Sequence, residues 1–162
     1  MSKKIWQEKT LYWKEYEEGV DFHKIVSPIV PMCDWDSKDS ADHPKKCITF
    51  STKESIISFI EKEAYKRHLL FSLWKTKGGV HGICLNYKLP CIRSYILHKP
   101  LNVDPVYQIY TVNRGYVLRC SPKKDRPEGR PIHLGFYGRG KPFYENQLVE
   151  EEHSSMLYTY FK

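Results

Sequence analysis

The chain has 162 residues, of which 41% are hydrophobic and 14% aromatic, with 26 Lys and Arg against 19 Asp and Glu. This length suits one domain that buries roughly two thirds of its unfolded surface, and the hydrophobic content excludes wholesale disorder. The apolar runs are shorter than the roughly 20 residues of a membrane-spanning helix. The five cysteines are odd in number and irregularly spaced, which favours a reducing compartment over a secreted disulfide framework.

The positive charge is concentrated in the second part of the chain. Residues 1–66 hold 11 Lys and Arg against 12 Asp and Glu, a net charge of −1, whereas residues 67–162 hold 15 against 7, a net charge of +8. Such a bias suits nucleic acid, an anionic membrane surface or an acidic protein, and charge alone does not choose among them. We therefore distinguish residues 1–66 from a basic, hairpin-rich extension over 67–162, which is compatible with one continuous domain.

A helix is the strongest element in the first part. Residues 5–35 are rich in aromatics and broken by prolines, which predicts extended segments and turns. A polar loop over 36–47 precedes a short predicted strand over 47–50. Ser51 and Glu54 have the spacing of a capping box, and the isoleucines that follow form a broad apolar face. A helix of about three turns is therefore predicted over 52–65.

Two hairpins are predicted after this helix. Residues 69–74 and 80–87 flank the turn KTKGG, and the alternating segments 106–112 and 116–120 flank Asn113-Arg114-Gly115. A polar loop over 121–131, the string GFYGRGKPFY and an aromatic end follow as a less regular C-terminal arm. The predicted fold class is α+β, with a small antiparallel sheet packed on one main helix.

Catalytic motifs are not evident. The glycine-containing segments GGVHG and GFYGRG match neither a phosphate-binding loop nor a dinucleotide fingerprint. His81, Cys84, Cys91 and His98 lie within eighteen residues, and imidazole and thiolate are suitable zinc ligands. The tight Cys-x2-Cys knuckle of structural zinc sites is missing, so a small zinc-binding module remains an alternative, and buried cysteines with hydrogen-bonded histidines are the simpler interpretation.

A second alternative is a basic nucleic-acid-binding protein, for example one associated with an organellar ribosome. Basic and aromatic residues alternate in YGRGKPFY (137–144) and RSYILHKP (93–100), which would combine phosphate contacts with base stacking. No RNA- or DNA-binding motif accompanies them, and basic residues on a hairpin or a polar loop are ordinary solvated positions. Nucleic acid is therefore the less favoured partner.

The segment ITFSTKESIISFIEKEAY (48–65) resembles the "iron-sulfur protein 4" (AQDQ) family, an accessory subunit of mitochondrial respiratory complex I with a segment close to LTFSTKEDAISFAEKNGW. The residues that match in register are Thr49, Phe50, Ser51, Thr52, Lys53, Glu54, Ser58, Phe59, Glu61 and Lys62. Upstream, residues 13–16 resemble the family's W-K-x-E-F entry and residues 27–35 its N-P-L-M-G-W segment, followed by Ser37 and Asp39 in a polar loop. The resemblance covers about residues 12–66, and the residues beyond form an extension.

The resemblance implies a non-catalytic subunit, without a cofactor or metal of its own despite the family's name. It would brace core subunits and neighbouring accessory subunits in the matrix arm of complex I, peripheral to the mitochondrial inner membrane. Trp35 and Phe50 are expected to close over the apolar face of the 52–65 helix. The candidate packing and interface residues are Trp13, Trp35, Phe50, Ser51, Glu54, Phe59, Arg114, Lys123, Lys124, Arg126, Tyr137 and Arg139.

Overall fold

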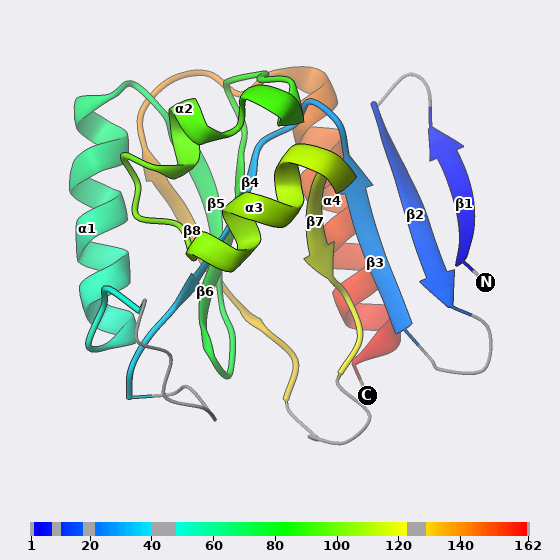
Figure 1. Ribbon diagram of the computed structural model, residues 1–162, viewed down its shortest axis with the longest axis horizontal. Helices are drawn as coiled ribbons and strands as arrows, with labels where there is room; N and C mark the ends of the chain where they lie inside the picture. The colour runs from blue at the N-terminus through cyan, green and yellow to red at the C-terminus, as the bar shows by residue number, and fades with distance from the viewer. Residues whose placement is uncertain (1, 8–10, 18–21, 40–47, 123–128, 162) are drawn as a thin grey trace.

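The computed structural model describes residues 2–7, 11–17, 22–39, 48–122 and 129–161, within which two four-stranded antiparallel sheets form (Figure 1). The first sheet has the order β1-β2-β3-β7, with strands Ser2–Gln7, Tyr12–Glu17, Phe22–Ser27 and Tyr116–Arg119. The second has the order β4-β6-β5-β8, with strands Met32–Asp36, Gly79–Cys84, Leu70–Lys75 and Ile132–Gly138. The α+β class predicted from the sequence is confirmed.

The two central strands of the second sheet, β5 and β6, are buried on both faces. Along β5, Phe71 and Leu73 belong to one core cluster, and Trp74 belongs to the other. Along β6, Cys84 joins the first cluster and Ile83 the second, as expected for side chains that alternate across a strand. The first cluster packs against helix α1 (Lys53–Lys66) and the second against helix α4 (Tyr144–Tyr160).

Helix α1 and the hairpin that follows it confirm two sequence predictions. The helix buries Ile56, Ile60 and Ala64, which are spaced by one turn along a single face. Strands β5 and β6 pair antiparallel across the predicted turn. Gly79 is required there, because a Cβ atom would lie 1.8 Å from the Trp35 carbonyl oxygen. Phe50 forms an isolated bridge with Ser37 in place of the predicted strand over 47–50, whose first residue lies outside the described residues.

The second predicted hairpin is wrong, because its first strand is helix α3 (Pro105–Arg114). Pro105 occupies the first helical turn, where its missing N–H costs nothing, and the Asp104 side chain accepts a hydrogen bond from the Val106 N–H. Gly115 has the expected positive φ of 91°, but it ends a helix and does not turn a hairpin. A 3-10 turn, η2 (Cys91–Arg93), and the short helix α2 (Tyr95–His98) precede α3.

The prediction of an irregular C-terminal arm is also wrong, because β8 completes the second sheet and the 17-residue helix α4 follows. The buried side of α4 carries Asn146, Val149, His153, Met156 and Leu157, at the three- and four-residue spacing of a helix face. Two of these five residues are polar, so the apolar periodicity is weak in the sequence. Among the described residues, no helix combines the length and apolar composition that crossing a bilayer requires.

Both sheets combine strands from the two sides of residue 66. In the first sheet, β3 pairs with β7, with Ile25 opposite Leu118. In the second, β4 pairs with β6, with Trp35 opposite Val80. The core clusters are mixed in the same way, so residues 1–66 and the basic extension are joined by continuous backbone hydrogen bonding and packing.

Candidate functional site

The start of α1 is fixed by a capping box one residue later than the sequence predicted. Thr52 is the N-cap, and its hydroxyl accepts a hydrogen bond from the Ser55 N–H at 3.1 Å. The Ser55 hydroxyl oxygen accepts from the Thr52 N–H at 3.2 Å. Ser51 and Glu54 are exposed, so the predicted pairing of Ser51 with Glu54 is wrong. Glu54 remains in the first turn, where its negative charge favours the helix dipole.

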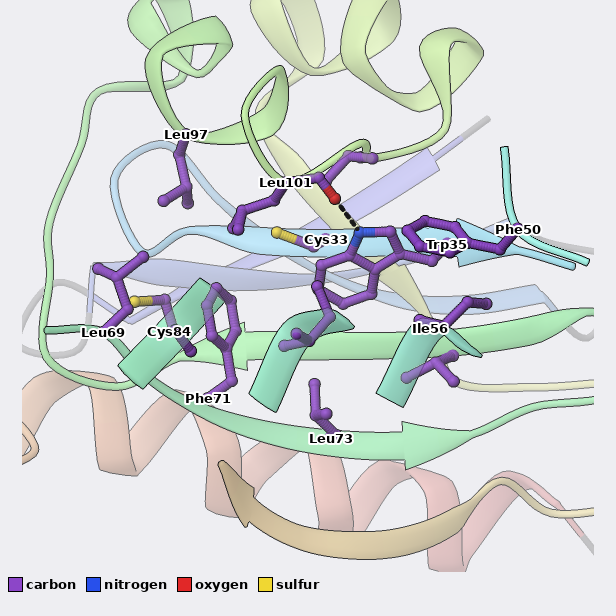
Figure 2. Packing of buried hydrophobic residues seen from close by; sticks show 14 of the residues in the cluster. Cys33, Trp35, Phe50, Ile56, Leu69, Phe71, Leu73, Cys84, Leu97 and Leu101 are labelled. Carbon is purple, nitrogen blue, oxygen red and sulfur yellow. Dashed lines mark hydrogen bonds between the residues drawn. The ribbon is translucent and has the colours of Figure 1, made fainter. Parts of the chain in front are cut away.

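Trp35 and Phe50 pack over α1 as predicted (Figure 2). Trp35 is fully buried, meets the Phe71 ring edge-on at 6.0 Å, and donates a hydrogen bond from Nε1 to the Leu101 carbonyl oxygen at 2.8 Å. The rings of Phe50 and Phe59 lie 5.3 Å apart. These aromatics join β4, α1 and the segment before α3 into one packed unit.

Of the other candidate residues, Tyr137 packs against this unit and Arg139 contacts the end of α1, whereas Trp13 and Arg114 lie on other elements. Trp13 lies on β2 and donates from Nε1 to the Glu15 carboxylate at 3.0 Å. Arg114 ends α3, with its guanidinium carbon 4.4 Å from the centroid of the Tyr110 ring. Tyr137 lies on β8, where it donates to the Leu134 carbonyl oxygen at 3.4 Å. The remaining basic candidates Lys123, Lys124 and Arg126 lie outside the described residues.

A buried histidine cluster lies between β6, β7 and α4, which sequence reasoning missed. The Nε2 atoms of His153 and His81 are 3.0 Å apart, and His153 Nδ1 lies 3.3 Å from the Cys120 sulfur. Burial lowers the pKa of His81 to about 3, and it lowers the pKa of His153 well below its usual value, with the neighbouring histidines adding to the effect. Burial also raises the pKa of the Cys120 thiol, so all three groups are uncharged at neutral pH.

A second polar group beside this cluster has the residue types of a hydrolase triad but not its geometry. Ser72 Oγ lies 2.7 Å from His133 Nε2 and 3.2 Å from the Glu150 carboxylate, which is 4.0 Å from the same Nε2 atom. In a triad the carboxylate holds the opposite ring nitrogen, Nδ1, and so orients the imidazole. Ser72 is also fully buried. The arrangement joins β5, β8 and α4 without presenting a nucleophile to a substrate.

The four residues considered as zinc ligands contact different partners. His81 contacts His153, and His98 Nε2 lies 2.8 Å from the Met32 carbonyl oxygen. Cys84 Sγ lies 3.7 Å from the Asn86 side-chain oxygen. Within the described ranges, no group of three or more His, Cys, Asp or Glu side chains is placed to hold a metal ion.

A basic aromatic surface forms where the end of α1, the segment after β6 and the loop between β8 and α4 meet. In Figure 1 that loop passes over the upper edge of the molecule, on the side where α1 ends. The surface carries five cationic side chains, four aromatic rings and one histidine: Tyr65, Lys66, Arg67, His68, Tyr87, Lys88, Arg139, Lys141, Phe143 and Tyr144. The sequence string YGRGKPFY indicated its last part, whereas the residues from α1 and β6 could be joined to it only by the fold.

Only two carboxylates pair with the cations of this surface among the described residues. Glu63 contacts Arg67 at 3.1 Å, and Glu145 contacts Lys88 at 3.2 Å. The two carboxylates neutralise Arg67 and Lys88. The three remaining cations, Lys66, Arg139 and Lys141, give the surface a net charge of +3. Four of the five cations come from residues 67–162, so part of the positive charge of that region gathers at this surface, and Lys66 joins it from residues 1–66.

No protein-family model, curated protein or solved structure matches this chain.

Proposed function

We propose that this chain acts by binding and not by catalysis, as an accessory subunit on the matrix side of respiratory complex I. The observation that carries the proposal is the packed unit of Trp35, Phe50 and α1. Three of the residues by which the sequence resembles the accessory-subunit family, Trp35, Phe50 and Phe59, meet in this unit, and Thr52 sets the helix start. A rigid helix held by buried aromatics suits a subunit that braces its neighbours.

The residues of α1 that match the family segment divide into two groups. Phe59 is half-buried and packs against Phe50, so its role is internal. Ser58, Glu61 and Lys62 are exposed and contribute nothing to the core of this chain. This exposed face of α1 is available for a core subunit, with charged groups that would fix the orientation of docking.

Native electrophoresis of detergent-solubilised mitochondria tests the proposal. The tagged chain is expected to migrate with NADH dehydrogenase activity, and Glu61→Lys is expected to reduce that association. Glu151→Lys is the matched control, because Glu151 is an exposed acid in the middle of another helix, α4. Migration of the wild-type chain apart from NADH dehydrogenase activity would refute the proposal, as would equal loss of association in both variants.

A further inference from the structure

We propose that the basic aromatic surface binds single-stranded nucleic acid, with exposed tyrosines stacking on bases and basic side chains contacting phosphates. This inference is independent of the complex I proposal, because it concerns different residues and a different class of ligand. Its starting point is the combination of a net positive charge with exposed rings on one face, which is how proteins bind single strands with little sequence preference.

Arg139 is held in place by the end of α1. Its guanidinium carbon lies 4.3 Å from the centroid of the Tyr65 ring. Its Nε donates to the Tyr65 carbonyl oxygen at 2.7 Å, and one terminal nitrogen lies 2.8 Å from His68 Nε2. The second terminal nitrogen has no partner among the described residues. Arg139 is thus pre-oriented with donors still available for a phosphate, which reduces the entropy lost on binding.

Asn86 joins the three segments that form the surface. Its side-chain nitrogen donates to the carbonyl oxygens of His68 at 2.9 Å and Arg139 at 3.2 Å, and its side-chain oxygen accepts from the Leu70 N–H at 2.8 Å. Gly140 lies against it so closely that a Cβ atom would be 2.3 Å from the Asn86 side-chain nitrogen. The loop from β8 to α4 is therefore fixed relative to the end of α1, so the surface is largely formed before any ligand arrives.

All four aromatic rings of the surface are exposed, although Arg139 lies over the Tyr65 ring and Lys88 over the Phe143 ring, each on one face. Tyr144 is 70% exposed, Tyr65 58%, Phe143 43% and Tyr87 37%. Duplex bases are already stacked and paired, whereas the bases of a single strand are free to lie on tyrosine rings. Rings and cations together therefore favour a single strand over a duplex or an acidic protein.

Fluorescence anisotropy with the full-length chain tests this inference. The probes are labelled oligo(U) and oligo(dT) of about 16 nucleotides, within the length range that single-strand-binding modules cover. A duplex of the same length and polyglutamate provide the comparison. We expect salt-sensitive binding of one or both single strands that is at least several-fold tighter than binding of the comparison ligands. Equal or tighter binding of the duplex or of polyglutamate would overturn the inference, as would no binding of either single strand at low salt.

Two pairs of variants separate stacking from charge. Tyr144→Ser is expected to weaken binding roughly tenfold without changing the salt dependence. Lys66→Gln/Lys141→Gln is expected to lower the slope of log affinity against log salt by about 1.4, since each phosphate contact on a single strand contributes about 0.7. The first control is Tyr158→Ser, at the far end of α4 and 72% exposed. The second is Lys38→Gln/Lys77→Gln, two exposed lysines outside the segments that form the surface, one after β4 and one in the turn between β5 and β6.

The outcome is decided by comparing each variant with its control. Loss of affinity in Tyr144→Ser but not Tyr158→Ser, together with a reduced slope only for the Lys66 and Lys141 pair, supports the surface as the site. Equal effects in variants and controls would show that binding is a general consequence of net charge, and would refute the assignment. Circular dichroism of each variant confirms that the fold is retained, as expected for exposed side chains.

Discussion

Mild acid is expected to destabilise this protein through three buried histidines. Burial lowers the pKa of His81 to about 3 and that of His98 to about 4, and it lowers the pKa of His153 well below its usual value. His98 Nε2 faces the Met32 carbonyl oxygen and therefore carries the proton, while its buried Nδ1 has no partner among the described residues. A second proton on His98 would have to be buried without an acceptor.

The size of the effect follows from the protons that unfolding takes up. In the unfolded chain each histidine binds a proton as the pH falls below about 6.5, whereas the folded chain keeps all three neutral. The contribution of the neutral histidines to the free energy of unfolding is therefore fully present above about pH 6.5. Below that pH it falls by about 1.4 kcal/mol per pH unit for each histidine. Between pH 7.5 and 5.5 the three residues together should lower the free energy of unfolding by about 4 kcal/mol, a large share of a typical 5–15 kcal/mol.

Urea denaturation, followed by tryptophan fluorescence at several pH values across this range, measures the slope of the free energy of unfolding against pH. His98→Gln should remove about one third of it, since one of three histidines no longer titrates. Lys77→Gln, at an exposed position in the turn between β5 and β6, is the control and should retain the wild-type slope. A free energy of unfolding that stays constant from pH 7.5 to 5.5 would refute the reasoning, as would an unchanged slope in His98→Gln.

Two further predictions concern the packed unit around α1. Thr52→Ala should lower the free energy of unfolding by about 1 kcal/mol because it removes the N-cap, whereas Ser51→Ala, one residue earlier and exposed, should change it little. Reversed effects in thermal denaturation would contradict the cap assignment. Trp35→Phe should cost about 2–4 kcal/mol, because it opens a cavity and leaves the buried Leu101 carbonyl without its donor; a change under about 1 kcal/mol in urea unfolding would contradict the packing described.

The elements predicted correctly are those with a strong local signal. Helix α1 and the β5–β6 hairpin combine regular apolar spacing with suitable turn residues, so local sequence and tertiary packing favour the same structure. In α3, the β-branched and aromatic residues of VYQIYTV favoured a strand, and Ile109 and Tyr110 face solvent, so no apolar stripe revealed the helix. The decisive signal was Asp104-Pro105, which starts a helix.

Helix α4 and the histidine cluster depend on contacts between distant parts of the chain. Asn146 is buried because its side chain donates to the carbonyl oxygens of Cys84 and Tyr87. His153 is buried because it meets His81 and Cys120. Asparagine usually lies on the surface and histidine is intermediate in burial, and the partners of Asn146 and His153 are 33 to 72 residues away. Likewise, the sequence YGRGKPFY indicated the part of the basic aromatic surface that precedes α4. The part at the end of α1 could be joined to it only from the folded structure.

The pairing of β3 with β7 places Lys24 opposite Arg119, 95 residues later in the chain. During synthesis, β3 therefore leaves the ribosome long before the strand that covers its edge exists. Likewise, β4 is synthesised before its partner β6, and β5 before its partner β8, so each sheet is completed late in synthesis. Such long-range pairing slows folding and leaves strand edges open to other chains in the interval. The nascent chain is accordingly expected to depend on chaperones more than its modest length alone would suggest.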